Sequence, residues 1–464
     1  MRHRSWLAVV LLLAAACSRS GATASGPSVA PLEPYTPPNS GPVDEVTVDG
    51  IVDHLEALQA IADEHAGTRA AGSPGYDASV RYVADLLRAT GYEIETVPTS
   101  VPTFEQQAPS LLEEVAPPGR RWVDGRDFRA MLFSPSGDAE GRLVRLVGSG
   151  CATEDFATFP EGAVALVGTG ECFRRQQVVN AQDAGAVAMI AVSSASPGRP
   201  LRPTLVYPGG LAIPALSVTQ EVGAELRDGT VVHVRVRAES SFEDAESVIA
   251  ELPGDPGADV VMLGAHLDSV MDGPGLNDNG SGTALLLEVA RWLGSRDPQP
   301  TVRFAFWAGE EEGLYGSWDY AHALSSEERD ALAVYLNLDM VGSTNHVTFV
   351  YEASRGDPAM SRRVARLFEE ALADLGAESE PLDLHGSSDH ASFEDVGVPT
   401  GGLYSGSQER KTASQASSFG GTEGEPLDPC YHQPCDTIDN VSRSALGTHA
   451  AALVAVLGVL LAAA

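Results

Sequence analysis

The sequence is poor in positive charge, and lysine is almost absent from it. Arginine and lysine together number 30 against 64 aspartates and glutamates, which gives a formal net charge of −34. The single lysine is Lys411. Such an acidic chain argues against a nucleic-acid partner, because that partner needs basic side chains along one face. The acidity is typical of a well-solvated secreted surface.

Several catalytic motifs are missing as well. Lys411 has no glycines before it, so the chain carries no phosphate-binding loop, and chemistry through a lysine Schiff base is disfavoured. Neither His-Glu-x-x-His nor Gly-x-Ser-x-Gly occurs. The 464 residues, 43% of them hydrophobic, nevertheless suffice for two domains with a large core.

The N-terminal residues predict export. Residues 1–16, MRHRSWLAVVLLLAAA, combine a basic start with a short apolar core and small residues at the end. They predict a secretory signal peptide that is too short to span a membrane. Cys17 follows directly, and AAAC resembles a bacterial lipoprotein cleavage box, with cleavage after Ala16 and free secretion as the alternative. Residues 17–45 are rich in Ser, Gly and Pro and predict a flexible tether.

Cysteine is scarce, with five residues in the chain. Cys151 and Cys172 lie close in sequence, as do Cys430 and Cys435, and an exported chain can oxidise both pairs. Cys17 is then left over, and a lipid thioether would account for it. We therefore predict a cell-envelope lipoprotein anchored through Cys17, or a secreted protein, with no other membrane contact. The apolar segment from residue 449 is too short to span a bilayer and predicts a buried terminal helix.

Helices and strands alternate along most of the chain. The pattern is helical from Asp44, and further helices are predicted at 76–90, 317–329 and 358–375. From residue 248 onward the alternation predicts an α/β fold, a mostly parallel central sheet with helices on both faces. Between these parts, short β-branched runs are broken by glycine and proline. We predict an inserted β-rich α+β domain at 126–240, within a main domain formed by 46–125 and 241–464.

Histidine and carboxylate side chains gather at the predicted strand ends: His266 and Asp268, Glu310 to Glu312, Asp339, Asp278 in a loop before a helix, and His432 between two cysteines. In an open parallel sheet, ligands bind outside the carboxyl ends of the strands. One such residue would be an ordinary polar terminus. Several of them delivered to one edge predict a divalent-metal site.

The residue types favour zinc, because imidazole and carboxylate in mixture suit zinc and its neighbours. Two histidines and three carboxylates exceed the three protein ligands of one catalytic zinc and suit two ions that share a bridging carboxylate. If residues 310–312 are extended, neighbouring side chains point in opposite directions, so one glutamate can bind metal while another acts as a general base. Spacing alone does not assign the three glutamates. The segment NDNGSG lacks the carboxylate spacing of an EF-hand calcium loop.

A series of motifs resembles the secreted two-zinc aminopeptidases, whose relatives include glutamate carboxypeptidases and glutaminyl cyclases: GAHLDSV, GLNDNGSG, FWAGEEEGLYGS, LNLDMVGS, GSSDHASFEDVGVPTGGLYSG and DPCYHQPCDT. The segment GAVALVGTGECFRRQQVVNAQDAGAVAMIAV resembles a protease-associated (PA) domain. The resemblance implies the zinc exopeptidase fold with an inserted PA domain.

The resemblance also implies a role for each site residue. His266 and Asp339 would hold one zinc ion, Glu311 and His432 the other, and Asp278 would bridge both. Glu310 would be the general base, Asp268 would orient the His266 ring through its other nitrogen, and Tyr431 would help to stabilise the tetrahedral intermediate. Cys430 and Cys435 would pair and fix His432, and a cis peptide bond is expected at Asp278–Asn279.

The implied function is an exported aminopeptidase with two Zn²⁺ ions per chain, which hydrolyses N-terminal residues from peptides by a metal-activated water with Glu310 as base. Its partners would be peptides with a free N-terminus, and it would act as a monomer. A metallocarboxypeptidase of the same fold, a glutaminyl cyclase and an inactive peptide-binding homologue are the alternatives. Ser387 stands where some of these aminopeptidases carry an arginine, and Asp389 and His390 fit either a helix cap or core hydrogen bonding. The long loop at 407–428 is either a lid or specificity element, or disordered.

Overall fold

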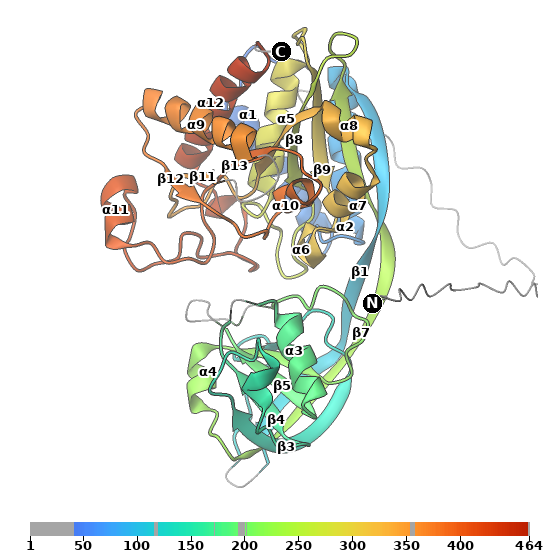
Figure 1. The fold of residues 1–464 in the computed structure, drawn as a ribbon, viewed down its shortest axis with the longest axis vertical. Coiled ribbons are helices and arrows are strands. Elements are labelled where there is room, and N and C mark those ends of the chain that lie inside the picture. Colours follow the sequence, from blue (N-terminus) through green and yellow to red (C-terminus); the bar gives the residue numbers. More distant parts are fainter. Residues whose placement is uncertain are drawn as a thin grey trace, which may run out of the picture. The chain divides into compact units, whose positions relative to one another are not determined.

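The protein is described here by a computed structural model, which covers residues 41–115, 119–170, 172–193, 200, 202–352 and 358–462. The predicted signal peptide, most of the tether and Cys17 lie outside these residues. Within them the strands form one 13-stranded sheet in the order β12-β11-β13-β10-β8-β9-β7-β3-β4-β5-β6-β2, with β1 paired to β7. Helices accompany the sheet along its length (Figure 1), so the predicted α/β class is confirmed.

Two helices precede the first strand, α1 (Val48–Glu64) and α2 (Pro74–Thr90). The side chains of Thr47 and Ser73 cap their first turns by accepting hydrogen bonds from backbone N–H groups. Helix α2 ends at Gly91, whose φ of 102° lies in the left-handed region that glycine adopts without a Cβ penalty. Both helices bury an apolar face in the main core, as their sequence spacing predicts.

The longest strands are β1 (Glu93–Glu114) and β7 (Val231–Leu252), which pair antiparallel from end to end (Figure 1). Near its C-terminus β7 also pairs with β9 (Thr301–Trp307), and near its N-terminus with β3 (Gly137–Arg145). One strand therefore belongs to both parts of the sheet. Because β7 runs across residue 240, the boundaries of the two domains stay a prediction.

The segment between β1 and β7 has an apolar cluster of its own. It contains β2 (Phe128–Ala130), β3, the 3₁₀ turn η1 (Thr153–Phe156), β4 (Val164–Val167), α3 (Arg174–Asp183), β5 (Ala188–Val192), β6 (Ala215–Val218) and α4 (Gln220–Glu225). Strands β3 to β6 pair in parallel, and β2 joins β6 antiparallel. This β-rich composition agrees with the predicted insert.

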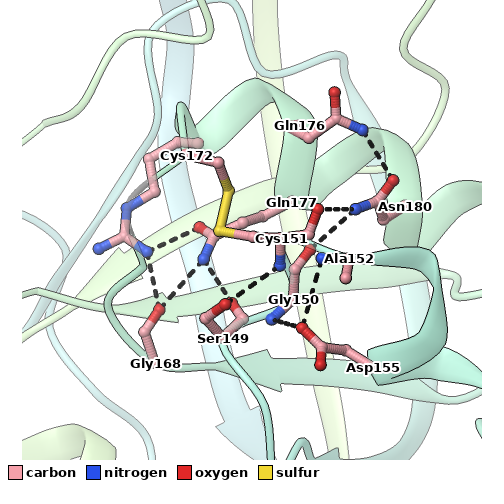
Figure 2. The surroundings of a disulfide bond; sticks show 11 residues. Ser149, Gly150, Cys151, Ala152, Asp155, Gly168, Cys172, Gln176, Gln177 and Asn180 are labelled. Carbon is pink, nitrogen blue, oxygen red and sulfur yellow. Dashed lines mark hydrogen bonds between the residues drawn. A yellow bond between two sulfur atoms is a disulfide. The ribbon is translucent and has the colours of Figure 1, made fainter.

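A disulfide between Cys151 and Cys172 links the loop before η1 to the segment before α3 (Figure 2). Amide side chains of α3 hold the same loop. Gln177 donates to the main-chain oxygen of Ser149, and Asn180 donates to the main-chain oxygens of Gly150 and Cys151. The predicted pairing of these two cysteines is confirmed, and the loop is closed both covalently and by hydrogen bonds.

The central strands of the main domain are β8 (Val260–His266), β9, β10 (Leu332–Leu338) and β13 (Thr400–Tyr404), which are parallel to one another. β11 (Phe349–Tyr351) and β12 (Glu380–Leu382) extend this sheet beyond β13. Helices α1, α2, α5 (Gly280–Leu293), α9 (Pro358–Asp374) and α12 (Arg443–Leu460) share one apolar cluster with the strands. Helices α7 (Tyr315–Ala323) and α10 (His390–Asp395) share another, so the prediction of helices on both faces is confirmed.

One predicted helix is divided in two. The segment SWDYAHALSSEER reads as a single helix in the sequence, but α7 ends at Ala323 and α8 (Ser326–Ala331) begins anew. Ser325 accepts a hydrogen bond from Glu328 N–H, and the Glu328 carboxylate accepts one from Ser325 N–H. This reciprocal capping starts a second helix, because it satisfies donors that a continuous helix would bond internally.

Among the described residues, α12 is the one helix whose length and composition would allow a membrane crossing. Half of its apolar stretch is buried inside the protein. Leu446, Leu453 and Leu457 are fully buried in the main core. The burial is typical of a core helix and agrees with the predicted buried terminal helix.

Candidate metal centre

Five of the predicted ligand side chains meet at the carboxyl ends of the parallel strands. His266 is the last residue of β8, Asp339 follows β10, and Asp278 lies just before α5. His266 Nε2 is 3.2 Å from Asp278 Oδ1 and 3.5 Å from Asp339 Oδ1. His432 Nε2 is 3.1 Å from Asp278 Oδ2 and 3.0 Å from Glu311 Oε2. Asp278 therefore faces both imidazoles, each through a different oxygen.

These residues fit a divalent-metal site. Ligand atoms of His266, Asp278 and Glu311 all lie within 4.8 Å of one another. Among the described residues, Glu311 Oε1 and Asp339 Oδ1 are buried without a hydrogen-bond partner. A buried carboxylate oxygen without a partner is costly, and a cation beside it would remove that cost. The two oxygens of Asp278 point to different histidines, which fits a divalent-metal site.

The pKa values reflect the crowding of negative charge. Burial raises the pKa of Glu311 to about 6, although His432 opposes the rise and Asp278 adds to it. Burial lowers the pKa of His266, but the nearby carboxylates, Glu310 first, hold it well above its usual value. The raised pKa values mean that Glu311 and His266 tend to keep their protons among the clustered carboxylates. This is expected at a site that binds a cation.

Asp268 connects two strand ends. His266 Nδ1 lies 3.1 Å from the main-chain oxygen of Asp268 and 3.7 Å from its carboxylate, so the ring donates to the carbonyl group. The carboxylate instead accepts hydrogen bonds from Glu310 N–H and Glu311 N–H, at 3.3 and 3.2 Å. Asp268 thus orients the His266 ring, with Nε2 toward the other carboxylates, and also holds the turn of the glutamates.

The three adjacent glutamates form a single helical turn, α6 (Glu310–Gly313), so the extended segment assumed from the sequence is wrong. Gly309 and Leu314 adopt left-handed conformations on either side of the turn. The N–H groups of its first two residues donate to Asp268. In a strand, these N–H groups would donate to a neighbouring strand instead. Side chains still diverge, by about 100° per residue in a helix. Glu310 and Glu311 line the site cavity, whereas Glu312 is buried outside that lining.

His432 lies between Cys430 and Cys435, which form the predicted disulfide. The ring of Tyr431 stacks on the imidazole, with 3.8 Å between ring centroids. Asp436, in the same loop, accepts hydrogen bonds from the backbone N–H groups of Asn277 and Asp278. The loop therefore places one candidate ligand, His432, and holds the backbone of Asp278. The Asp278–Asn279 peptide bond is cis, as the resemblance implied.

The site opens into a cavity of about 200 Å³. Its lining comprises Asp278, Glu310, Glu311, Asp339, Met340, Leu384, Ser387, Tyr404, Ser407, Gln408, Glu409, Tyr431 and His432. A larger cavity of about 600 Å³, bordered by β1, β9 and α7, contains none of the predicted ligands. The smaller cavity is the candidate substrate site, because it alone of the two reaches the convergent donors.

Ser387, Asp389 and His390 differ in their relation to this cavity. Ser387 lines it, in the place of the arginine that some aminopeptidases carry. Asp389 and His390 are buried, and Asp389 makes no side-chain capping bond to α10. Asp389 therefore occupies the N-cap position of α10 without a capping bond from its side chain. The His390 ring packs edge-on against Tyr351, with 5.1 Å between ring centroids, and its Nδ1 atom is buried without a hydrogen-bond partner among the described residues, so the observed contact is packing and not the expected core hydrogen bond.

The sequence analysis did not single out Arg69, whose side chain holds a loop of the candidate site by hydrogen bonds. Its side chain is fully buried, and the guanidinium donates to the main-chain oxygens of Leu267, Pro274 and Gly275. Burial lowers its pKa to about 10, so the group remains charged at neutral pH. These carbonyls belong to the loop that joins His266 to Asp278. The sequence feature that could have pointed to Arg69 is a charged side chain among the small residues of GTRAAGSPG, where no local motif accounts for it.

Replacing Arg69 with lysine should destabilise the fold and weaken metal binding, because an ammonium group does not reproduce the planar fork that reaches three carbonyls. Each buried acceptor left unsatisfied costs about 1–3 kcal/mol. Urea unfolding and Zn²⁺ titration would measure the two effects, with the exposed α2 residue Arg81→Lys as control. An unchanged unfolding midpoint together with unchanged zinc affinity would contradict this role.

The fold and the site together define a class: an α/β protein whose histidine and carboxylate side chains converge, as in a divalent-metal centre, at the carboxyl edge of its sheet. Residues 247–457 match the model of Peptidase family M28, and residues 139–226 match that of the PA domain. The Probable lipoprotein aminopeptidase LpqL of Mycobacterium tuberculosis is 38% identical over 429 residues, which cover 89% of this chain and 85% of that protein. An aminopeptidase of Pseudomonas aeruginosa is 36% identical over 422 residues, covering 87% and 79%.

Solved structures show the same similarity. The aminopeptidase from Aneurinibacillus sp. strain AM-1 has a TM-score of 0.72 at 27% identity, over 90% of this chain and 94% of that one. BSAP, a zinc aminopeptidase from Bacillus subtilis, has a TM-score of 0.67 at 26% identity, over 89% and 95%. The chain belongs to peptidase family M28 and carries a PA domain. The predicted enzyme class, a metallopeptidase, and the predicted presence of a PA domain are thereby confirmed.

Proposed function

We propose that the protein is an exported zinc aminopeptidase that removes N-terminal residues from peptides and holds two zinc ions per chain. The observation that carries the proposal is Asp278, whose two oxygens face His266 and His432 at 3.2 and 3.1 Å. The names of the relatives support it, since LpqL and the Pseudomonas protein are called aminopeptidases and BSAP a zinc aminopeptidase.

In this proposal, His266 and Asp339 hold one ion, Glu311 and His432 the other, and Asp278 both. When bound, the ions would lower the pKa of a water molecule and polarise the scissile carbonyl group. Two ligand oxygens have no hydrogen-bond partner among the described residues, Glu311 Oε1 and Asp339 Oδ1. We expect the ions to stabilise these two atoms most, because each would gain a cation as its partner.

Glu310 is the proposed general base. It lines the cavity beside the ligand Glu311, and its backbone is held by Asp268. Burial raises its pKa well above the usual range, and Asp339 and Glu311 add to the rise against the opposing charge of His266. A carboxylate with a raised pKa is a better proton acceptor near neutral pH. Glu310 would take a proton from the attacking water and give it to the departing amine.

Tyr431 is the proposed donor to the oxyanion. It lines the cavity and stacks on His432. Burial raises the pKa of its phenol well above the usual range, and the charges of Asp278 and Glu311 raise it further. The phenol therefore keeps its proton and can donate a hydrogen bond to the oxygen on which negative charge develops.

Export and an N-terminal lipid on Cys17 belong to the same proposal, although residues 1–40 lie outside the described part. The two disulfides support an oxidising compartment, and LpqL is named a lipoprotein. Intact-mass analysis of membrane-extracted protein should show a diacylglyceryl addition on a chain that begins at Cys17. An unmodified chain that begins at this residue would favour free secretion.

The function is tested with one peptide in free and N-acetylated forms, with and without a chelator, followed by mass spectrometry. We expect loss of N-terminal residues from the free form alone, abolished by the chelator and restored by zinc. Trimming from the carboxyl end would assign the protein to the carboxypeptidase alternative. Absence of cleavage with two zinc ions bound would contradict the proposal and direct attention to Ser387.

A further inference from the structure

The cavity that contains the candidate ligands also contains a carboxylate that belongs to none of the strand ends, Glu409. It lies in the loop after β13, and its side chain lines the cavity together with Ser407 and Gln408. Within the described residues, no arginine, lysine or histidine forms an ion pair with it, whereas the histidines of the metal centre each face other carboxylates. Neither the ligand set nor the proposed mechanism uses Glu409.

The Glu409 carboxylate is held in place. Its Oε2 atom accepts hydrogen bonds from Ser407 N–H at 2.8 Å and from the Ser407 hydroxyl at 3.1 Å. The main chain of this loop is tied to the segment before His432, because Leu427 N–H donates to Glu409 O and Asp428 N–H to Ser407 O. Little side-chain entropy would be lost when a ligand binds to a carboxylate fixed in this way.

The basic residues next to Glu409 are engaged elsewhere. Lys411 Nζ donates to the main-chain oxygens of His346 and Gly420, at 2.7 and 2.8 Å. Arg410 donates to the main-chain oxygen of Gly424. The negative charge of Glu409 is therefore left for a group that enters the cavity.

The charge balance of the cavity indicates what the Glu409 carboxylate can bind. Asp278, Glu310, Glu311 and Asp339 are the other carboxylates of the cavity lining, and two divalent ions would cancel their combined charge. Glu409 then remains as an uncancelled negative charge. Glu409 is exposed to solvent at the wall of the cavity, and its uncancelled negative charge favours a cationic ligand there.

The wall of the cavity offers room for an aliphatic stem between the metal ligands and Glu409. Met340, Leu384 and Tyr404 contribute apolar surface to the same lining. Burial raises the pKa of the Tyr404 phenol well above the usual range. The charges of Glu409, Asp339 and Asp278 add to this rise, in that order, so the phenol lies within the electrostatic influence of Glu409 and of the candidate ligands. An apolar wall followed by a carboxylate is suited to the methylene chain and charged head of lysine or arginine.

We propose that Glu409 selects peptides whose first residue is basic, by pairing its carboxylate with the side-chain ammonium or guanidinium group of that residue. The inference rests on the proposed aminopeptidase function and adds the substrate class to it. A competing role is recognition of the free α-amine, which every N-terminal residue carries.

The test compares lysine and leucine p-nitroanilides on the zinc-loaded full chain. Glu409→Gln should lower kcat/KM for the lysine substrate about 3- to 5-fold, as expected for an ion pair with a solvent-exposed carboxylate, and mainly through KM. The leucine substrate should change less than about twofold, because the apolar wall is intact. Glu409→Asp should recover part of the loss, and the exposed loop residue Glu425→Gln is the matched control.

Equal losses on both substrates would overturn the inference in favour of α-amine recognition, and no loss on either would exclude Glu409 from specificity. If the unmodified protein releases neither p-nitroaniline, the proposed function fails first. Calorimetry of lysinamide and leucinamide with the zinc-loaded protein then still tests Glu409. Lysinamide should bind more tightly, and Glu409→Gln should remove that advantage; equal binding of the two amides would overturn the inference.

Discussion

Replacing Glu310 with glutamine should lower kcat by about 10²- to 10⁴-fold, the range that general acid–base catalysis contributes. The substitution keeps the size of the side chain and the backbone hydrogen bond to Asp268, which is made by Glu310 N–H. It removes only the ability to accept a proton. Zinc content and unfolding temperature should therefore remain close to those of the unmodified protein.

The two neighbouring glutamates provide the comparison. Glu311→Gln should reduce the zinc content, because Glu311 Oε2 is the atom 3.0 Å from His432 Nε2. Glu312→Gln should have little effect on activity, since Glu312 does not line the cavity. If Glu310→Gln retained full activity, or lost its zinc, the assignment of base and ligand would be wrong.

Removing the metal with a chelator should abolish activity and lower the unfolding temperature, and zinc should restore both. Without cations, Asp278, Glu311 and Asp339 are buried close together, and their mutual repulsion destabilises the fold. A ligand that binds only the folded state stabilises it by about 4 kcal/mol at a thousand times its dissociation constant. Scanning fluorimetry and peptide hydrolysis on the same samples would measure both effects.

The stabilisation by zinc should be larger at pH 8 than at pH 5. In the chelated protein the pKa of Glu311 is raised to about 6 and that of His266 is raised well above its usual value. The folded state therefore holds more protons than the unfolded one in this range, so stability is lost as the pH rises. Zinc needs deprotonated ligands and opposes that loss. A zinc-induced shift in unfolding temperature that is independent of pH, or activity that survives complete chelation, would contradict the metal centre.

Local patterns allowed much of this protein to be predicted. Helix α2 follows from its apolar spacing and from Gly91, and the parallel sheet follows from alternating strands and helices. His266 and Asp339 could be identified as site residues because each ends a strand, and the carboxyl ends of parallel strands share one edge. Both disulfide pairings followed from nearness in sequence. These features depend on neighbours along the chain, which a sequence displays directly.

The remaining features depend on contacts between residues far apart in sequence. The turn that begins at Glu310 is helical because Asp268, 42 residues earlier, accepts its first N–H group. The loop before Asp278 is held by Arg69, about 200 residues away, and by Asp436, 158 residues away. The spacing of three adjacent glutamates does not assign a role to each of them. The tertiary structure does distinguish them, because it brings Glu311 to His432. A polar side chain acquires such a role only when folding removes water and supplies its partner, and no local pattern encodes that partner.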